Sequence, residues 1–178
     1  MKAVFLDRDG VINRKAPEGE YIPSWDEVRF FPDVFESVSD LYRAGFKIIV
    51  ITNQRGIALR KVQLEDLEDI HARMKRSFAR RGTVIAGIYF CPHDISEDCQ
   101  CRKPRPGLLM QAATEHALDL RCCWMVGDAD SDIEAGRRAG CKTVRIISRL
   151  PSGRNEPKAD ITARDLRSAV RKILKCFS

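Results

Sequence analysis

The sequence predicts an α/β fold of three layers, Rossmann-like, in which a mostly parallel central sheet lies between helices. Short apolar runs rich in β-branched or aromatic residues alternate with segments of helical periodicity. Glycines and prolines lie where the helical segments begin or end. Strands that alternate with helices are joined by right-handed crossovers, which place helices on both faces of a parallel sheet.

Five strands and five helices are expected, in alternating order. The predicted strands cover residues 3–6, 47–51, 84–90, 122–126 and 143–147. The predicted helices cover residues 34–44, 64–80, 107–118, 131–139 and 163–176. Pro32 and Asp33 precede the first helix, and Gly45, Gly82 and Gly140 lie just past three helix ends, where a left-handed residue is favoured.

The size and composition predict one globular domain over residues 1–178. The chain is 44% hydrophobic and 31% charged, which is ordinary for a domain with its own core. Residues 148–157, with two prolines and a glycine, indicate a surface loop, because the residues after them are too few to form a second core. No membrane span or secretory signal is recognisable, so a cytoplasmic protein is expected. In that reducing compartment, seven cysteines do not indicate a disulfide framework.

The formal net charge is +6. The densest basic stretch lies on the second predicted helix and has no interleaved aromatic residues of the kind that bind single-stranded nucleic acid. It comprises Arg73, Lys75, Arg76, Arg80 and Arg81. We interpret this stretch as a solvated helix face and do not expect a nucleic-acid partner. His71 and His116, on predicted helices, are expected at or near the surface.

Polar residues follow four of the predicted strands, at the edge where ligands bind in parallel sheets. Asp7 and Asp9 follow the first strand, and Gly10 permits the turn that would aim both carboxylates inward. Such a pair can also be ordinary turn or cap chemistry. Thr52 follows the second strand, where a hydroxyl and free backbone N–H groups suit a phosphate oxygen.

The third and fourth strand ends add a cation and a carboxylate cluster. Lys103 lies in the loop beyond the third strand, where it would neutralise a phosphoryl group or be a solvated loop lysine. Asp128, Asp130 and Asp132 follow the fourth strand, and oxygen ligands at this spacing suit a hard cation such as Mg²⁺. One of the three is also expected to cap the next helix.

In this order the four strand ends resemble the motifs of the haloacid-dehalogenase-like (HAD) hydrolases: Asp-x-Asp-x-[Thr/Val], Thr/Ser, Lys, and Gly-Asp-x-x-x-Asp. The matching residues are 7–11, Thr52, Lys103 and 127–132, and the resemblance covers about residues 2–147.

The resemblance implies a magnesium-dependent phosphatase that works through a phosphorylated aspartate. Asp7 would be the nucleophile, and Asp9 would act as general acid and then base. Mg²⁺ would be held by Asp7, the Asp9 backbone carbonyl and Asp128, with Asp132 in support. Thr52 and Lys103 would hold the phosphoryl oxygens, and the cations would offset repulsion between a carboxylate and a phosphate.

Four soft or borderline ligands lie within eleven residues after the third strand: Cys91, His93, Cys99 and Cys101. This spacing is typical of a structural, tetrahedral Zn²⁺ site, and the alternative is a set of reduced, unliganded thiols. A bound Zn²⁺ would stiffen the loop that carries Arg102 and Lys103.

No cap domain is expected. About 42 residues separate Asp9 from Thr52, and about 50 separate Thr52 from Lys103, which one crossover helix, a strand and loops nearly fill. Short loops must therefore recognise the substrate at an open site, which suits a small phosphate ester.

Together with the zinc-loop pattern, this resembles one branch of the family, the D-glycero-D-manno-heptose 1,7-bisphosphate 7-phosphatases, with histidinol-phosphate phosphatases as siblings. The matching strings are residues 5–13, 52–54 with 56–58, 91–93, and 99–104 with 106–107. The resemblance implies substrate contacts from Arg8, Tyr21, Asn53, Gln54, Arg55 and Arg102. Arg55, where a small residue is common, and Ala129, where a lysine is often found, depart from the pattern and leave substrate identity and anomer open.

The expected partner is a small phosphorylated substrate, a sugar phosphate, bound by a monomer. Three alternatives stay open at this point: a histidinol-phosphate phosphatase, a polynucleotide 3′-phosphatase, and a phosphosugar-binding protein without catalytic activity. Steep salt dependence on nucleic acid would indicate the second.

Overall fold

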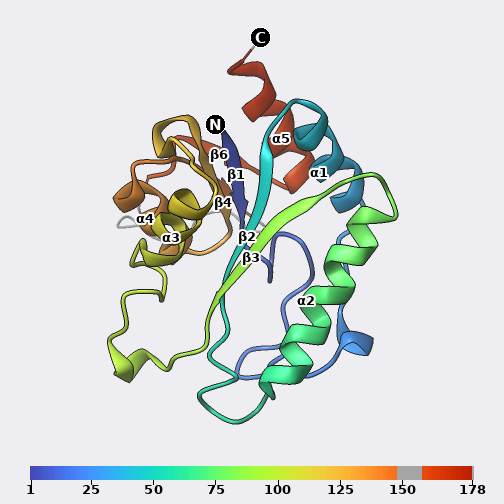
Figure 1. Ribbon diagram of the computed structural model, residues 1–178, viewed down its shortest axis with the longest axis vertical. Helices are drawn as coiled ribbons and strands as arrows, with labels where there is room; N and C mark the ends of the chain where they lie inside the picture. The colour runs from blue at the N-terminus through green and yellow to red at the C-terminus, as the bar shows by residue number, and fades with distance from the viewer. Residues whose placement is uncertain (148–157, 178) are drawn as a thin grey trace.

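The computed structural model describes residues 1–147 and 158–177, and its described strands form one six-stranded parallel sheet (Figure 1). The strands are β1 (Ala3–Leu6), β2 (Lys47–Asn53), β3 (Ile85–Cys91), β4 (Trp124–Gly127), β5 (Lys142–Ile146) and β6 (Ile161–Ala163). Their order across the sheet is β3-β2-β1-β4-β5-β6, and all five pairings are parallel.

The chain reverses its direction across the sheet between β1 and β4. From β1 it proceeds outward through β2 to β3, and from β4 outward the other way to β6. Phe5 of β1 therefore lies opposite Ile49 of β2 on one side and Met125 of β4 on the other. In open α/β sheets, ligands bind beyond the carboxyl ends of the strands at such a reversal. The topology thus places the expected site after β1 and β4.

Helices cover both faces of the sheet, as Figure 1 shows. One core joins β1 to α1, α2 and α5, and the other joins it to α3 and α4. These helices are α1 (Val34–Arg43), α2 (Leu64–Ala79), α3 (Gly107–Glu115), α4 (Asp130–Ala139) and α5 (Leu166–Lys175). Alternate residues of β1 enter the two cores, Val4 and Leu6 the first, Ala3 and Phe5 the second, because successive strand side chains point to opposite faces.

The five predicted strands and five predicted helices are present, although β2 extends two residues further, to Asn53, and α3 ends three residues earlier, at Glu115. Ile161–Ala163 forms β6, which the sequence did not reveal, so α5 begins at Leu166 and not at residue 163. Leu120–Cys122 is a short 3-10 helix, so β4 begins two residues later than predicted. The loop predicted over residues 148–157 lies outside the described residues.

The expected absence of a cap domain is confirmed for the two segments that could hold one. Between Asp9 and Thr52 the chain forms only the short 3-10 helix Trp25–Glu27, then α1 and β2. Between Thr52 and Lys103 it forms α2, β3 and the 3-10 helix Ile95–Glu97. Over residues 1–147 and 158–177, no helix has the length and apolar character needed to cross a bilayer.

Candidate active site

The four predicted strand ends meet at one edge of the sheet. Asp7 directly follows β1, and its backbone N–H donates to the Val126 carbonyl of β4 at 3.0 Å. Thr52 is the penultimate residue of β2, although the strand was expected to end at residue 51. The side chains of Asp7, Thr52 and Lys103 are all buried. The structure therefore brings together groups that lie up to about one hundred residues apart in the chain.

Three carboxylates form one cluster there. One oxygen each from Asp7, Asp128 and Asp132 lies within 4.8 Å of the others. Gly127 permits this approach, because a Cβ at that position would lie 2.1 Å from Asp132 Cβ. Among the described residues, Asp128 Oδ1 is buried without a hydrogen-bond partner. An orphaned carboxylate oxygen beside two further carboxylates fits a hard, oxygen-ligated cation such as Mg²⁺.

Lys103 balances part of this negative charge. Its ammonium group lies 2.8 Å from Asp7 Oδ1 and 2.6 Å from Asp132 Oδ1, and it donates to the Ile51 carbonyl at 2.9 Å. Burial alone would lower the pKa of Lys103, but the two carboxylates outweigh burial and raise that pKa. Lys103 is therefore a fixed positive charge at the strand ends.

The carboxyl group of Asp7 has a pKa raised to about 7. Burial is the largest cause, and the negative charges of Asp132 and Asp9 act in the same direction, while Lys103 opposes them. The pKa of Asp128 is also raised, again chiefly by burial. A divalent cation would relieve both effects, because it favours the ionised form of each carboxylate.

Asp9 has the opposite environment, in which hydrogen-bond donors surround its carboxylate. Asn13 Nδ2 donates to Oδ1 at 2.8 Å and Gln54 Nε2 donates to Oδ2 at 2.9 Å. Arg8 donates to the same carboxylate from Nε at 3.1 Å and from Nη2 at 2.8 Å. Burial would raise the pKa of Asp9, but the charge of Arg8 and these hydrogen bonds lower it. Asp7 and Asp9, two residues apart, thus have pKa values shifted in opposite directions.

The two residues after Thr52 organise their neighbours. The Gln54 side chain is buried and donates to Thr52 Oγ1 at 2.9 Å as well as to Asp9. The Asn53 side chain forms two hydrogen bonds with the backbone of Lys103. Its Nδ2 donates to the Lys103 carbonyl and its Oδ1 accepts from the Lys103 N–H, both at 3.1 Å. Both residues were expected to contact substrate, and both bind protein groups in the structure.

Arg8 and His71 lie where the sequence did not place them. Arg8, expected to contact substrate, is only 2% exposed and binds Asp9 and the His71 ring. His71, expected near the surface, is buried beneath the Asp7–Asp9 loop. The physical reason is that α2 packs across this loop, so a histidine on its inner face satisfies a buried guanidinium.

The cysteine–histidine loop has the geometry of a tetrahedral metal site. The sulfur–sulfur distances are 3.5 Å for Cys91–Cys99 and 3.4 Å for Cys99–Cys101. His93 Nδ1 lies 3.6 Å from the Cys91 sulfur and 3.1 Å from the Cys101 sulfur. Tetrahedral Zn²⁺ with the usual bond lengths separates its ligands by about 3.5 to 3.8 Å. The four predicted residues therefore fit Zn²⁺.

The remaining predicted contact residues lie around the site at intermediate exposure. Arg102 Nη1 donates to the His93 carbonyl at 3.3 Å, which ties the metal loop to the residue before Lys103. Arg55 forms an ion pair with Asp94 of the same loop. Tyr21 packs against Gly56, where a Cβ would lie 2.8 Å from the tyrosine ring.

Two basic residues near the carboxylate cluster were missed by the sequence analysis. Lys15 Nζ lies 2.7 Å from Asp128 Oδ2, and Arg145 forms an ion pair with Asp130. Lys15 is in a loop without periodicity, and Arg145 is part of β5, which mixes polar and apolar residues. Neither position carries a motif, so only the tertiary structure reveals them.

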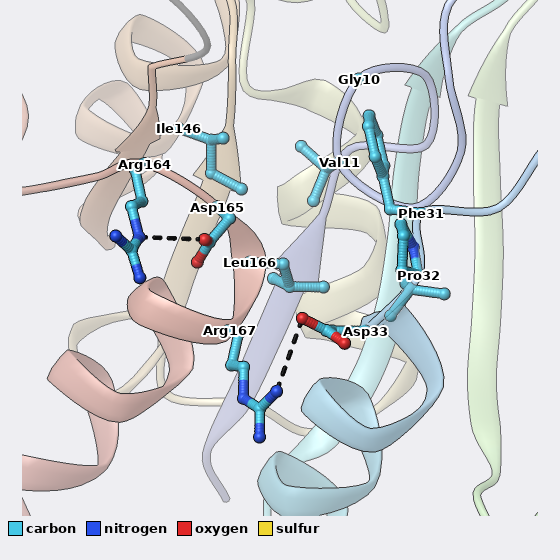
Figure 2. A pocket seen from close by; sticks show the side chains of 11 residues that line it. Gly10, Val11, Phe31, Pro32, Asp33, Ile146, Arg164, Asp165, Leu166 and Arg167 are labelled. Carbon is cyan, nitrogen blue, oxygen red and sulfur yellow. Dashed lines mark ion pairs between the residues drawn. The ribbon is translucent and has the colours of Figure 1, made fainter.

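A separate pocket of about 260 Å³ opens beside Gly10 and Val11 (Figure 2). Its walls are the starts of α1 and α5, where Arg167 pairs with Asp33 at 3.5 Å. None of the predicted catalytic or metal-binding residues lines it. The pocket reaches the segment after Asp9 through Gly10 and Val11.

A parallel sheet with aspartates after β1 and β4, a buried lysine and no cap defines a hydrolase of the HAD-like class. A HAD-hydrolase-like family model matches residues 100–169. A solved structure similar to this chain is that of the D,D-heptose 1,7-bisphosphate phosphatase from B. bronchiseptica, complexed with magnesium and phosphate. It superimposes with a TM-score of 0.90 and 31% identity over 98% of this chain and 99% of the other.

Two curated relatives are similar in sequence, and both are D-glycero-β-D-manno-heptose-1,7-bisphosphate 7-phosphatases. The Pseudomonas aeruginosa protein is 40% identical over 80% of this chain and 79% of its own length. The Helicobacter pylori J99 protein is 38% identical over 84% and 85%. The chain belongs to this family of HAD-like phosphatases.

Proposed function

We propose that the protein removes the phosphate at C7 of D-glycero-β-D-manno-heptose 1,7-bisphosphate in a magnesium-dependent reaction. The observation that carries the proposal is the cluster of three carboxylates, from Asp7, Asp128 and Asp132, of which Asp7 and Asp132 contact the buried Lys103 ammonium. The substrate is suggested by the relatives, which are 34% to 40% identical to this chain and are named for the β anomer.

Asp7 is the proposed nucleophile and Asp9 the proposed general acid and base. An Asp7 oxygen attacks phosphorus, the P–O bond to the sugar breaks, and the sugar oxygen takes a proton from Asp9. Asp9 then accepts a proton from water as that water attacks the phosphorylated aspartate and releases inorganic phosphate. The three residues that donate hydrogen bonds to Asp9 favour its ionised carboxylate, and this is the form that accepts a proton from water.

Positive charge at Asp7 supports attack by a carboxylate on an anionic phosphate. Mg²⁺, bound by Asp7, the Asp9 carbonyl, Asp128 and Asp132, would supply charge that offsets this repulsion. Lys103 contributes a second cation, 2.8 Å from Asp7 Oδ1, and would bind a phosphoryl oxygen. Since Thr52 Oγ1 already accepts from Gln54, its hydroxyl proton is available for donation to another phosphoryl oxygen.

The sugar and its second phosphate would be recognised from the β2 and β3 side. Arg102, Arg55 and Tyr21 are the proposed contacts, because they are partly exposed there. Asn53 and Gln54 would act mainly by holding Lys103, Asp9 and Thr52 in place. We further propose that Zn²⁺ in the cysteine–histidine loop fixes Arg102 and Lys103, which follow the last ligand Cys101.

The free thiols at all seven cysteines are compatible with a reducing compartment, and a cytoplasmic, monomeric, single-domain enzyme remains part of the proposal.

The test is a phosphate-release screen with Mg²⁺. It compares the β and α anomers of the heptose bisphosphate, histidinol phosphate and a 3′-phosphorylated oligonucleotide. The expected result is the highest kcat/KM with the β anomer, loss of activity with EDTA, and none in Asp7→Asn. A higher kcat/KM with histidinol phosphate or the oligonucleotide would overturn the substrate assignment and leave the phosphatase chemistry intact. Full activity of Asp7→Asn would overturn the chemistry itself.

A further inference from the structure

A chain of three side chains runs from the proposed general acid into the interior of the protein. Arg8 donates to Asp9 through Nε and Nη2, and its Nη1 lies 3.2 Å from Nε2 of His71 on α2. Arg8 is 2% exposed and His71 is 7% exposed, so water does not compete for either group. The His71 ring also packs against Phe90 at a centroid distance of 5.6 Å.

The chemistry of the pair fixes the state of the histidine. A guanidinium group only donates hydrogen bonds, so His71 must accept at Nε2 and carry its proton at Nδ1. The pKa of His71 is lowered to about 3, first by burial and then by the charge of Arg8. Asp9 opposes this effect and the more distant Lys75 adds to it. His71 is therefore a neutral acceptor, and among the described residues Asp9 is the carboxylate that pairs with Arg8.

The same pair also lies at the centre of the turn that shapes the loop. The Arg8 carbonyl accepts from the N–H groups of Ile12 at 2.9 Å and Asn13 at 3.1 Å. Asn13 in turn donates to Asp9 Oδ1. The backbone of Arg8 therefore holds the turn around Asp9, and its guanidinium holds both oxygens of the Asp9 carboxylate.

We propose that His71 is a positioning residue for the proton transfer, acting through Arg8 to fix the direction of the Asp9 carboxylate. Without an acceptor at position 71, Arg8 Nη1 would have no partner in the described part of the chain. The guanidinium would then reorient to satisfy its buried donor and would carry Asp9 with it. A displacement of about 1 Å at a catalytic group can lower the rate by about 100-fold. This inference rests on the proposed role of Asp9 as general acid.

The test uses two variants that differ in the acceptor and two substrates that differ in the leaving group. His71→Gln keeps a carbonyl acceptor and loses the ring, whereas His71→Leu loses both. An alkyl phosphate such as the sugar substrate needs a proton on its leaving oxygen, while p-nitrophenyl phosphate leaves as a stable anion and needs little help. A role in folding alone would affect both substrates equally.

We expect His71→Leu to slow leaving-group release in the first turnover, before the proton transfer from water to Asp9 that both substrates share, by roughly 10- to 100-fold for the alkyl ester and by less than about 3-fold for p-nitrophenyl phosphate. His71→Gln should stay within about 3-fold of the wild type on both. Equal losses on the two substrates, or no loss on either, would overturn the proposal. If His71→Leu does not fold, as judged by circular dichroism, His71→Met gives the same comparison, since its thioether is only a weak acceptor.

Asp9→Asn separates this inference from the function on which it rests. If Asp9→Asn slows leaving-group release in the first turnover far more for the alkyl ester, Asp9 is the general acid, and equal release rates of the two substrates in His71→Leu then overturn the role of His71 alone. If Asp9→Asn slows leaving-group release in the first turnover equally for both substrates, the general-acid assignment fails, and the positioning role fails with it.

Discussion

The ammonium group of Lys103 lies 2.8 Å from Asp7 Oδ1, and both side chains are buried at the end of β1. Two residues separated by most of the chain thus form a buried ion pair at the site where the proposed reaction begins. The pair contributes to both stability and catalysis, because the Lys103 cation that would stabilise the transferring phosphate also neutralises the buried nucleophile.

Lys103→Met should lower both stability and activity. It leaves Asp7 and Asp132 buried without their cation, a defect that typically costs about 3 to 5 kcal/mol of unfolding free energy. The rate of phosphate release should fall by at least about 100-fold, because a charge on the transition state is lost. Urea unfolding and steady-state kinetics measure the two effects. The exposed Lys75, changed to Met, is the control, and equal stability of the two variants would contradict the buried-pair account.

Removal of one ligand from the cysteine–histidine loop should affect the metal and the substrate together. Cys101→Ser is expected to lose about one bound Zn²⁺ per chain, to lower Tm and to weaken phosphate binding, because Arg102 and Lys103 follow that ligand directly. Cys122→Ser, at an exposed thiol outside the cluster, should change none of these. Elemental analysis, thermal denaturation and product inhibition by phosphate provide the readouts. Unchanged kinetics in a zinc-free preparation would contradict the proposed role of the loop.

Magnesium affinity should increase with pH across the neutral range. The pKa of Asp7 is raised to about 7 without metal, chiefly by burial, so below that pH much of the group is protonated. Mg²⁺ binds the ionised carboxylate, so binding must release this proton below about pH 7 and need not do so above it. Calorimetry in buffers of different ionisation enthalpy counts the released protons. A dissociation constant that does not change between about pH 6 and about pH 8 would contradict this prediction.

Gly10→Ala should weaken Mg²⁺ binding by more than backbone strain alone explains. Gly10 has a φ of +103°, and a Cβ there would lie 2.4 Å from Asp128 Oδ2. Gly19 has a φ of +80° and nothing within 4 Å of the corresponding position, so Gly19→Ala measures the strain without the contact. We expect both variants to lose about 1 kcal/mol of stability and only Gly10→Ala to bind Mg²⁺ at least about tenfold more weakly. Equal Mg²⁺ affinities in the two variants would show that Gly10 does not shape the site.

The motif residues at the strand ends could be predicted from the sequence because topology places them. A parallel sheet brings the carboxyl ends of its strands to one edge, so Asp7, Thr52 and Asp128 must lie near one another once the strands are recognised. The cysteine–histidine cluster could be predicted because its four residues are close in the chain. In both cases, local patterns and one rule of topology were sufficient.

The rest depended on packing that no local pattern encodes. β6 is only three residues long and lies at the sheet edge, so its apolar run is too short to distinguish from the start of the following helix. Arg8, predicted to contact substrate, lies between the two proposed catalytic aspartates. Its burial depends on His71, which is 63 residues away, and the ion pair of Lys15 with Asp128 depends on a loop conformation that periodicity does not specify.

The central claim is that Asp7 carries the phosphoryl group during turnover. The most direct measurement is to quench the enzyme during the reaction, treat it with borohydride, and map the modified peptide by mass spectrometry. Borohydride reduces an acyl phosphate on aspartate to homoserine. The account predicts homoserine at position 7 in the wild type and none in Asp7→Asn. Homoserine at another aspartate, or rapid turnover with unmodified Asp7, would contradict it.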